Sequence, residues 1–185
     1  MPTLARPDAP LTDGIVALRP FALEDVPAVT AACQDPEIAR WTASIPSPYE
    51  EEHARSWIAT HDSLWDQGEA AEFAVTAASD GHLLGSFGLR PLDWAHRTAG
   101  AGYWVVASER GQGVATRGLR LGAGWAHKVG LVTVELVTMI GNRASERVAE
   151  KSGFHVVEEI EDYEHTMAPD QHYHVKRWLL RGGVG

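Results

Sequence analysis

The stretch from Tyr103 to Thr116 constrains the fold of this chain most, because it joins three patterns in a fixed order. An apolar run over residues 102–107 is typical of a strand, Gly111 and Gly113 indicate a tight turn, and a helical pattern follows. Such a unit directs free backbone N–H groups and the positive end of a helix dipole toward one point. Glycines there let an anion approach the backbone, so the segment is predicted to bind a phosphate group. The turn lacks the Lys-Ser/Thr pair of a P-loop, which argues against nucleoside-triphosphate hydrolysis.

Composition narrows the class of protein. A chain of 185 residues that is 44% apolar can bury one core and is short for two domains. The net charge of −9 disfavours nucleic acid as a partner, and no apolar run is long enough to span a membrane. The single cysteine, Cys33, excludes an internal disulfide, fits a reducing cytoplasm and is predicted to fill the core. We expect a cytoplasmic domain over residues 14–181 after a loose leader over residues 1–13, which has no signal-peptide pattern.

Strand and helix patterns alternate along the rest of the chain. Helices are predicted over residues 23–34, 50–65, 113–129 and 142–152, and strands over residues 15–19, 72–77, 83–89, 102–107, 132–140, 155–161 and 171–180. A turn at residues 79–82 joins two of the strands into a hairpin. Three glycines inside the third helix, Gly118, Gly122 and Gly124, predict that another element packs closely there. These elements indicate one α/β domain.

The glycine turn resembles two phosphate-binding motifs. The run from Gly111 matches five positions of the dinucleotide-binding pattern G-x-G-x-x-G, and Glu135 lies about where that fold places its ribose-binding acid. The sixth position, however, is Thr116, and several strands precede the turn, whereas the dinucleotide motif follows the first strand of its unit. A nicotinamide-dependent oxidoreductase is therefore the weaker interpretation.

The second resemblance uses more of the chain. Arg110-x-x-Gly113-x-Ala115 resembles the R/Q-x-x-G-x-G/A signature of the GNAT acetyltransferase superfamily, and Gly102-Tyr103-Trp104 precedes it. The later block Asn142-x-x-Ser145-x-x-Val148-x-Glu150-Lys151-x-Gly153-Phe154 is similar to the second cofactor-side motif of the branch that contains RimJ- and RimL-type N-terminal acetyltransferases. The resemblance extends from about residue 14 to residue 181.

This resemblance implies a single α/β (α+β) GNAT-like domain with a mixed, mostly antiparallel sheet flanked by helices. Its two central strands, here residues 102–107 and 132–140, would splay into a V that holds the pantetheine of acetyl-CoA, a co-substrate used without a metal. A bulge near residues 103–106 would leave a backbone N–H free to polarise the acetyl carbonyl. The residues that the resemblance assigns to the cofactor are Val105, Val106, Arg110, Gly111, Gln112, Gly113, Val114, Ala115, Thr116 and Asn142.

The resemblance also implies catalytic residues. Many GNAT enzymes protonate the departing thiolate with a tyrosine seven residues after the asparagine, but that position is Ala149 here, so Ser145 is the candidate donor. Alternatively, Asn142 caps a helix and Ser145 only occupies its first turn. The glutamate that this branch often carries two residues before Gly-Tyr-Trp is Gly100 here. Glu135 is then the candidate base, and the other options are Glu72, His165, His172 and His174.

The acceptor is expected to be a primary amine, either a protein N-terminus or a small molecule, and the protein to be a monomer or a homodimer. The acidic run over residues 158–164 could attract a cationic acceptor or be a solvated loop. Trp41 and Trp94 could line an acceptor pocket, whereas Trp104 and Trp125 are expected in the core. His172-x-His174 lacks the companion ligands of a metal site. A rival to the enzyme is an acetyl-CoA-binding module that has lost catalysis.

Overall fold

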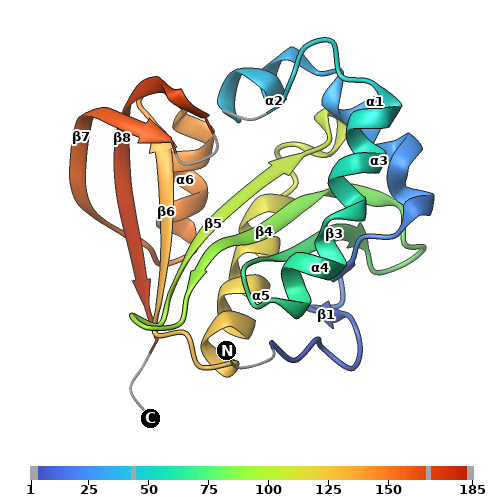
Figure 1. Ribbon diagram of the computed structural model, residues 1–185, viewed down its shortest axis with the longest axis horizontal. Coiled ribbons are helices and arrows are strands. Elements are labelled where there is room, and N and C mark those ends of the chain that lie inside the picture. Colours follow the sequence, from blue (N-terminus) through green and yellow to red (C-terminus); the bar gives the residue numbers. More distant parts are fainter. Residues whose placement is uncertain (1–3, 43–44, 166–167, 183–185) are drawn as a thin grey trace.

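A mixed sheet organises the computed structural model, which describes residues 4–42, 45–165 and 168–182 (Figure 1). In these residues the sheet has eight strands in the order β1-β2-β3-β4-β5-β6-β8-β7, and only the β5–β6 pair is parallel. The predicted mixed, mostly antiparallel sheet is confirmed. The elements are β1 (Leu11–Thr12), β2 (Val16–Pro20), η1 (Leu23–Asp25), α1 (Val26–Cys33), α2 (Pro36–Trp41), α3 (Glu51–Ala59), α4 (His61–Asp66), β3 (Ala71–Ala77), β4 (Leu83–Asp93), β5 (Thr98–Val105), η2 (Ala107–Glu109), α5 (Val114–Lys128), β6 (Thr133–Met139), α6 (Arg143–Lys151), β7 (His155–His165) and β8 (Ala168–Arg181).

The two central strands separate part of the way along. β5 and β6 pair from Thr98–Thr133 to Ala101–Leu136, and beyond the last pair each strand continues without the other. Figure 1 shows the result as a V that opens toward α2. The splay expected from the family resemblance is therefore confirmed, and we call the gap beyond Ala101 and Leu136 the V.

Helix α5 covers one face of the sheet and buries most of the core. Phe73 packs against Phe87 and also against Trp125 of this helix in one cluster of buried side chains. A Cβ added at Gly122 would overlap the Phe87 ring, so close packing explains this helical glycine, whereas Gly124 has no such neighbour within 4 Å. The helix predicted over residues 113–129 is confirmed, and the close packing predicted from its glycines is found at Gly122 but not at Gly124.

Helices α1 to α3 cover the other face and form a second, smaller core (Figure 1). Cys33 is buried there among Val26, Val29 and Ile58, as predicted. Burial raises the pKa of the Cys33 thiol to about 12, so the thiolate needed for nucleophilic attack is not available.

The helical boundaries differ from the sequence prediction at two places. One helix was expected over residues 50–65, but α3 and α4 are separate at Thr60, whose hydroxyl donates to the Trp57 carbonyl and competes with the helical ladder. Helix α2 was not predicted. It begins after Asp35, whose carboxylate accepts the Glu37 N–H at 2.9 Å.

The N-terminal segment differs from the expected loose leader. Leu4 is buried, its carbonyl accepts the Trp65 indole N–H at 3.1 Å, and Arg6 pairs with Asp62 and Asp66 of α4. Strand β1 then extends the sheet beside β2. Within the described ranges, no helix is both long enough and apolar enough to cross a membrane.

Candidate active site

The glycine turn links β5 to α5 and forms an open cradle. Gly111 and Gly113 have φ values of +79° and +83°, a left-handed conformation that favours glycine, and Gly113 is the N-cap of α5. A Cβ at either position would have no heavy atom within 4 Å, so open space lies above the backbone. Arg110 ties the turn to the start of α2 through an ion pair with Asp35 at 2.6 Å. The first N–H groups of α5 have no partner within the helix, which makes this cradle suitable for an anion.

The edge of β5 that faces the V carries backbone N–H groups that have no strand partner among the described residues. The Val106 N–H donates to the Leu84 carbonyl at 2.9 Å, toward β4. Because backbone groups of successive strand residues point to alternate sides, the N–H groups of Tyr103 and Val105 point away from β4 and into the V. They are candidates to polarise a carbonyl placed there.

The predicted bulge near residues 103–106 is wrong. Pairing of β4 with β5 is regular from Gly85–Val105 to Leu89–Ala101, and the register shifts instead between Leu89 and Leu92. Pro91 lies at the shift and has no N–H to donate to the ladder, which accounts for the irregularity there. The free N–H groups follow from the splay and need no bulge.

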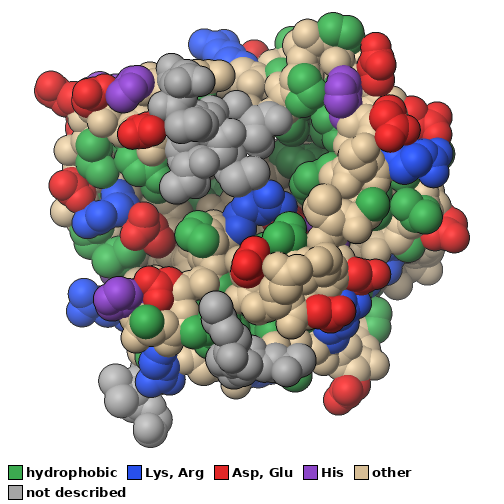
Figure 2. Space-filling model, in the orientation of Figure 1, with side chains coloured by type: hydrophobic (Ala, Val, Ile, Leu, Met, Phe, Trp, Pro, Cys, Tyr) green, Lys and Arg blue, Asp and Glu red, His purple; other side chains and the backbone are tan. Residues whose placement is uncertain are grey.

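A cavity of about 1040 Å³ connects the cradle, the V and helices α2 and α3. Figure 2 shows a hollow in this face of the molecule with hydrophobic side chains in its wall. Val106 does not line it, and Gln112 lines an adjoining hollow of about 500 Å³ that also carries Arg117, Arg120 and Lys151. The other residues predicted for the site all line the cavity: Val105, Arg110, Gly111, Gly113, Val114, Ala115, Thr116, Glu135, Asn142 and Ser145.

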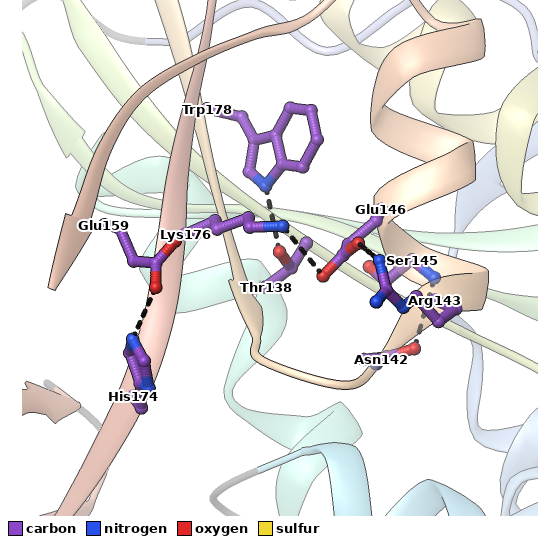
Figure 3. A network of polar contacts seen from close by, with 9 residues as sticks. All are labelled: Thr138, Asn142, Arg143, Ser145, Glu146, Glu159, His174, Lys176 and Trp178. Carbon is purple, nitrogen blue, oxygen red and sulfur yellow. Dashed lines mark hydrogen bonds and ion pairs between the residues drawn. The ribbon is translucent and has the colours of Figure 1, made fainter. Parts of the chain in front are cut away.

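Ser145 makes two separate contacts at the start of α6. Asn142 caps this helix by accepting the Ser145 N–H at 3.1 Å, as predicted (Figure 3). The Ser145 hydroxyl is left for another partner and forms a hydrogen bond with the Tyr103 hydroxyl at 2.7 Å. Burial raises the pKa of Tyr103 to about 12, which keeps the phenol protonated. No sequence pattern predicted this pair, which connects β5 to α6 beside the V.

A polar network fixes α6 against the far wall of the V (Figure 3). The buried Glu146 carboxylate contacts Arg143 at 3.3 Å and Lys176 of β8 at 3.4 Å. On β6, the Thr138 hydroxyl accepts the Trp178 indole N–H at 2.9 Å. These contacts hold Ser145 in a constant position relative to β6 and β8.

Three glycines lie side by side on the sheet face that α1 to α3 cover, and we call Gly88, Gly100 and Gly102 the glycine floor. Gly88 pairs with Gly102, and Gly100 pairs with Glu135 of β6. A Cβ at Gly100 would overlap the Arg90 carbonyl oxygen. The register shift of β4 therefore leaves no room for a glutamate at this position.

Two carboxylates flank the glycine floor. Glu135 lies beside Gly100 on the β6 side, because its neighbours Val134 and Leu136 point into the core on the opposite face. On the β3 side, Glu72 is 5% exposed, pairs with Gly88 across the sheet and forms an ion pair with Arg90. Burial raises the pKa of Glu72 against the opposing effect of Arg90. Both side chains line the cavity.

The other candidate residues lie elsewhere or have other partners. The acidic run over residues 158–164 lies on β7 rather than in a loop. Two of its carboxylates pair with the proposed histidine bases, Glu159 with His174 at 2.8 Å and Asp162 with His172 at 2.7 Å. The side chain of His165 lies outside the described part of the structure.

Two of the four tryptophans considered above lie where the sequence predicts, and two exchange positions between the core and the cavity wall. Trp41 lines the cavity and Trp125 is in the core, as expected. Trp94, in contrast, donates to the Gly68 carbonyl at 2.8 Å and packs against the core, and Trp104 lines the cavity. Trp104 faces the cavity because it shares a sheet face with Gly102.

An anion cradle at a helix N-terminus, beside strands that part to expose backbone N–H groups, defines a protein that binds an extended phosphorylated ligand against a sheet edge. The sheet excludes the dinucleotide-binding alternative, because that unit needs parallel strands and a turn after its first strand. Residues 16–155 match the family model described as the acetyltransferase (GNAT) domain. The chain therefore belongs to the GNAT acetyltransferase family.

The chain is also similar to individual acetyltransferases, in sequence or in fold. "Probable N-acetyltransferase YjcK" of Bacillus subtilis (strain 168) is 33% identical over 109 residues, a match that covers 58% of this chain and 60% of that relative. RimL, a ribosomal L7/L12 alpha-N-protein acetyltransferase solved with coenzyme A, has a TM-score of 0.81 at 18% identity, covering 93% of this chain and 96% of RimL. Spermidine N-acetyltransferase from Vibrio cholerae, solved with CoA and spermine, has a TM-score of 0.75 at 16% identity, covering 91% of this chain and 96% of that chain. The two structures share the fold.

Proposed function

We propose that this protein transfers the acetyl group of acetyl-CoA to a primary amine by direct attack in a ternary complex. The observation that carries the proposal is the V, where the free N–H groups of Tyr103 and Val105 lie next to the open cradle at Gly111 and Gly113. A ligand with a pyrophosphate at one end and a thioester at the other matches that order of groups. The cationic hollow beside the cradle suits the further phosphate of such a ligand.

The residues present fit each part of the ligand. Backbone N–H groups between Arg110 and Thr116 would hold the pyrophosphate, and Asn142 would lie beside the arm that runs into the V. The N–H groups of Tyr103 and Val105 would stabilise the developing oxyanion. Ser145 would donate a proton to the departing thiolate, with the Tyr103 phenol bonded to its hydroxyl.

The acceptor end of the cavity favours a cationic amine. Its wall on the α1–α3 side includes Trp41, Trp57 and Trp104, and the carboxylates of Glu72 and Glu135 open onto it. Aromatic faces and carboxylates attract an ammonium group without selecting its bearer. Two structures with this same fold are named as acetyltransferases of different amines. RimL is named for a protein α-amino group, and the spermidine enzyme for a polyamine. We propose a protein N-terminus or a small amine as the acceptor.

The test is CoA release from acetyl-CoA in the presence of a short peptide with a free α-amino group, or of spermidine. The proposal predicts amine-dependent release and an acetylated amine detected by mass spectrometry. Tight acetyl-CoA binding without release would favour the non-catalytic module. Absence of acetyl-CoA binding would refute the proposal.

A further inference from the structure

We infer that Glu72 takes the proton from the acceptor's ammonium group, held in position by Arg90, and that the amine sits over Gly102. This inference rests on the proposed function and names the base that its chemistry requires. The position where the family resemblance expects a glutamate, Gly100, cannot carry a side chain because of the Arg90 carbonyl. A base must therefore come from a neighbouring strand.

The first support is the free oxygen of the Glu72 carboxylate. Both contacts from Arg90 reach the same oxygen, Oε1. Oε2 has no hydrogen-bond partner among the described residues, although the side chain is 95% buried as judged from its 5% exposure. It lies directly over the Cα of Gly88, where a Cβ would overlap it, and the side chain lines the cavity. Oε2 is not among the side-chain atoms that are closed off from solvent, so the otherwise buried carboxylate presents one open oxygen to the cavity. An ammonium group there would supply its donor.

The second support is the distance across the sheet. Gly88 pairs with Gly102, and neighbouring strands lie about 4.8 Å apart. The Glu72 carboxylate, over Gly88, is therefore about one strand spacing from the mouth of the V, which begins just beyond Ala101. A Cβ at Gly102 would meet no heavy atom within 4 Å, so packing does not explain this glycine and an amine has room above it. That places a nitrogen within direct or water-mediated reach of Oε2.

The third support is the disposition of the acid and the base. Glu72 lies on the sheet face that α1 to α3 cover, whereas Tyr103 and Ser145 lie toward α5 and α6. An amine arriving from the first face would attack a thioester in the V while the thiolate leaves toward the second. With the base on one face and the acid on the other, the amine and the thiolate can approach and leave from opposite sides without rearrangement of the sheet.

The protons balance. The ammonium gives one proton to Glu72 Oε2, and the neutral amine attacks the acetyl carbon, forming the C–N bond. The C–S bond breaks as Ser145 gives its hydroxyl proton to the thiolate. The nitrogen loses its second proton, which passes through water in the cavity and restores the Ser145 hydroxyl. Glu72 then releases its proton to water in the cavity. The overall change is one amide, one thiol and one proton released.

Charged and titratable groups from three other elements lie near Glu72 or open onto the same cavity. Arg90 comes from β4, and His61 of α4 lies near Arg90. Burial and then Arg90 lower the pKa of His61 to about 4, so His61 stays neutral in the working range. Glu135 and Asp93 open onto the same cavity from β6 and β4. Glu135 is the rival base, and it lies near the Tyr163 phenol, whose pKa is raised by burial and by this carboxylate.

The experiment compares Glu72→Gln with wild type at pH 6.5 and pH 9.5, using acetyl-CoA and a short peptide with a free α-amino group. We expect kcat/KM to fall about 100- to 10,000-fold at pH 6.5. The deficit should narrow by about tenfold or more at pH 9.5, because an α-amino group with a pKa near 8 is then already neutral. Glu24→Gln, an exposed change of the same charge in η1 and outside the cavity, should match wild type at both pH values.

Gly102→Ala provides a second variant that leaves the ion pair intact. Its Cβ enters the open space, so calorimetry should show weaker peptide binding to the CoA complex, with acetyl-CoA affinity retained. Three results would overturn the inference. The loss of kcat/KM in Glu72→Gln could be equal at both pH values, or the pH-dependent loss could occur in Glu135→Gln instead. Peptide binding could also be unchanged in Gly102→Ala. A wild-type chain that binds acetyl-CoA yet acetylates neither amine would overturn the proposed function and this role with it.

Discussion

Substitution of Gly113 by alanine should weaken acetyl-CoA binding far more than it weakens the fold. Gly113 has a φ of +83°, so a Cβ there costs about 1–2 kcal/mol of stability. Gly81 in the β3–β4 turn has a φ of +79° and is also open within 4 Å, but it does not line the cavity, so Gly81→Ala isolates the backbone cost. The two variants should therefore lose similar stability in urea unfolding.

Their affinities should differ. At Gly113 the added methyl and the altered turn disturb the N–H groups that would face the pyrophosphate, and a hydrogen bond to a charged group contributes about 1.5–3 kcal/mol. Loss of one such bond corresponds to roughly ten- to a hundredfold in Kd, measured by calorimetric titration with acetyl-CoA. Gly81→Ala should retain wild-type affinity. Equal affinities in the two folded variants would show that the cradle does not hold the pyrophosphate.

Three further outcomes are expected. Ser145→Ala should lower kcat about ten- to ten-thousand-fold with little change in acetyl-CoA affinity. Adding Tyr103→Phe should lower kcat little further, because the two hydroxyls act as one pair. Normal kcat with lower thermal stability would assign Ser145 a structural role only. His61 has a folded pKa of about 4 against 6.5 in the unfolded chain, so the unfolded chain binds the proton first and stability is lost as pH falls from 6.5 to 4. The free energy of unfolding should fall by about 3 kcal/mol over this range. Urea titrations at pH 7 and pH 4.5 should show most of this fall in wild type and little of it in His61→Phe. An equal fall in both proteins would contradict the burial argument. Gly122→Ala should destabilise the fold by about 1–3 kcal/mol while Gly124→Ala is neutral or stabilising, and equal effects in thermal unfolding would refute the packing explanation.

The elements nearest the cradle could be predicted from sequence because their signals are local. The strand, the glycine turn and α5 each depend on residues within a few positions of one another, and the cap of α6 by Asn142 depends on a three-residue spacing. Helix α2 has a local signal as well, an N-cap Asp35 followed by Pro36 at the first helical position, although the helix was not predicted.

The parts that escaped prediction depend on long-range register. The bond between Tyr103 and Ser145 joins residues 42 positions apart. The exclusion of a side chain at Gly100 follows from a shift of β4 at Arg90 and Pro91, which no spacing near Gly100 reveals. Cross-strand pairs of this kind are fixed only once the whole sheet has formed.

A crystal structure of the protein with acetyl-CoA and a non-transferable amine tests the central claim most directly. We predict the pyrophosphate on the N–H groups between Arg110 and Thr116, the thioester in the V beside Tyr103, and the amine over Gly102. A ligand bound outside the V, or a pyrophosphate away from the glycine turn, would contradict the account.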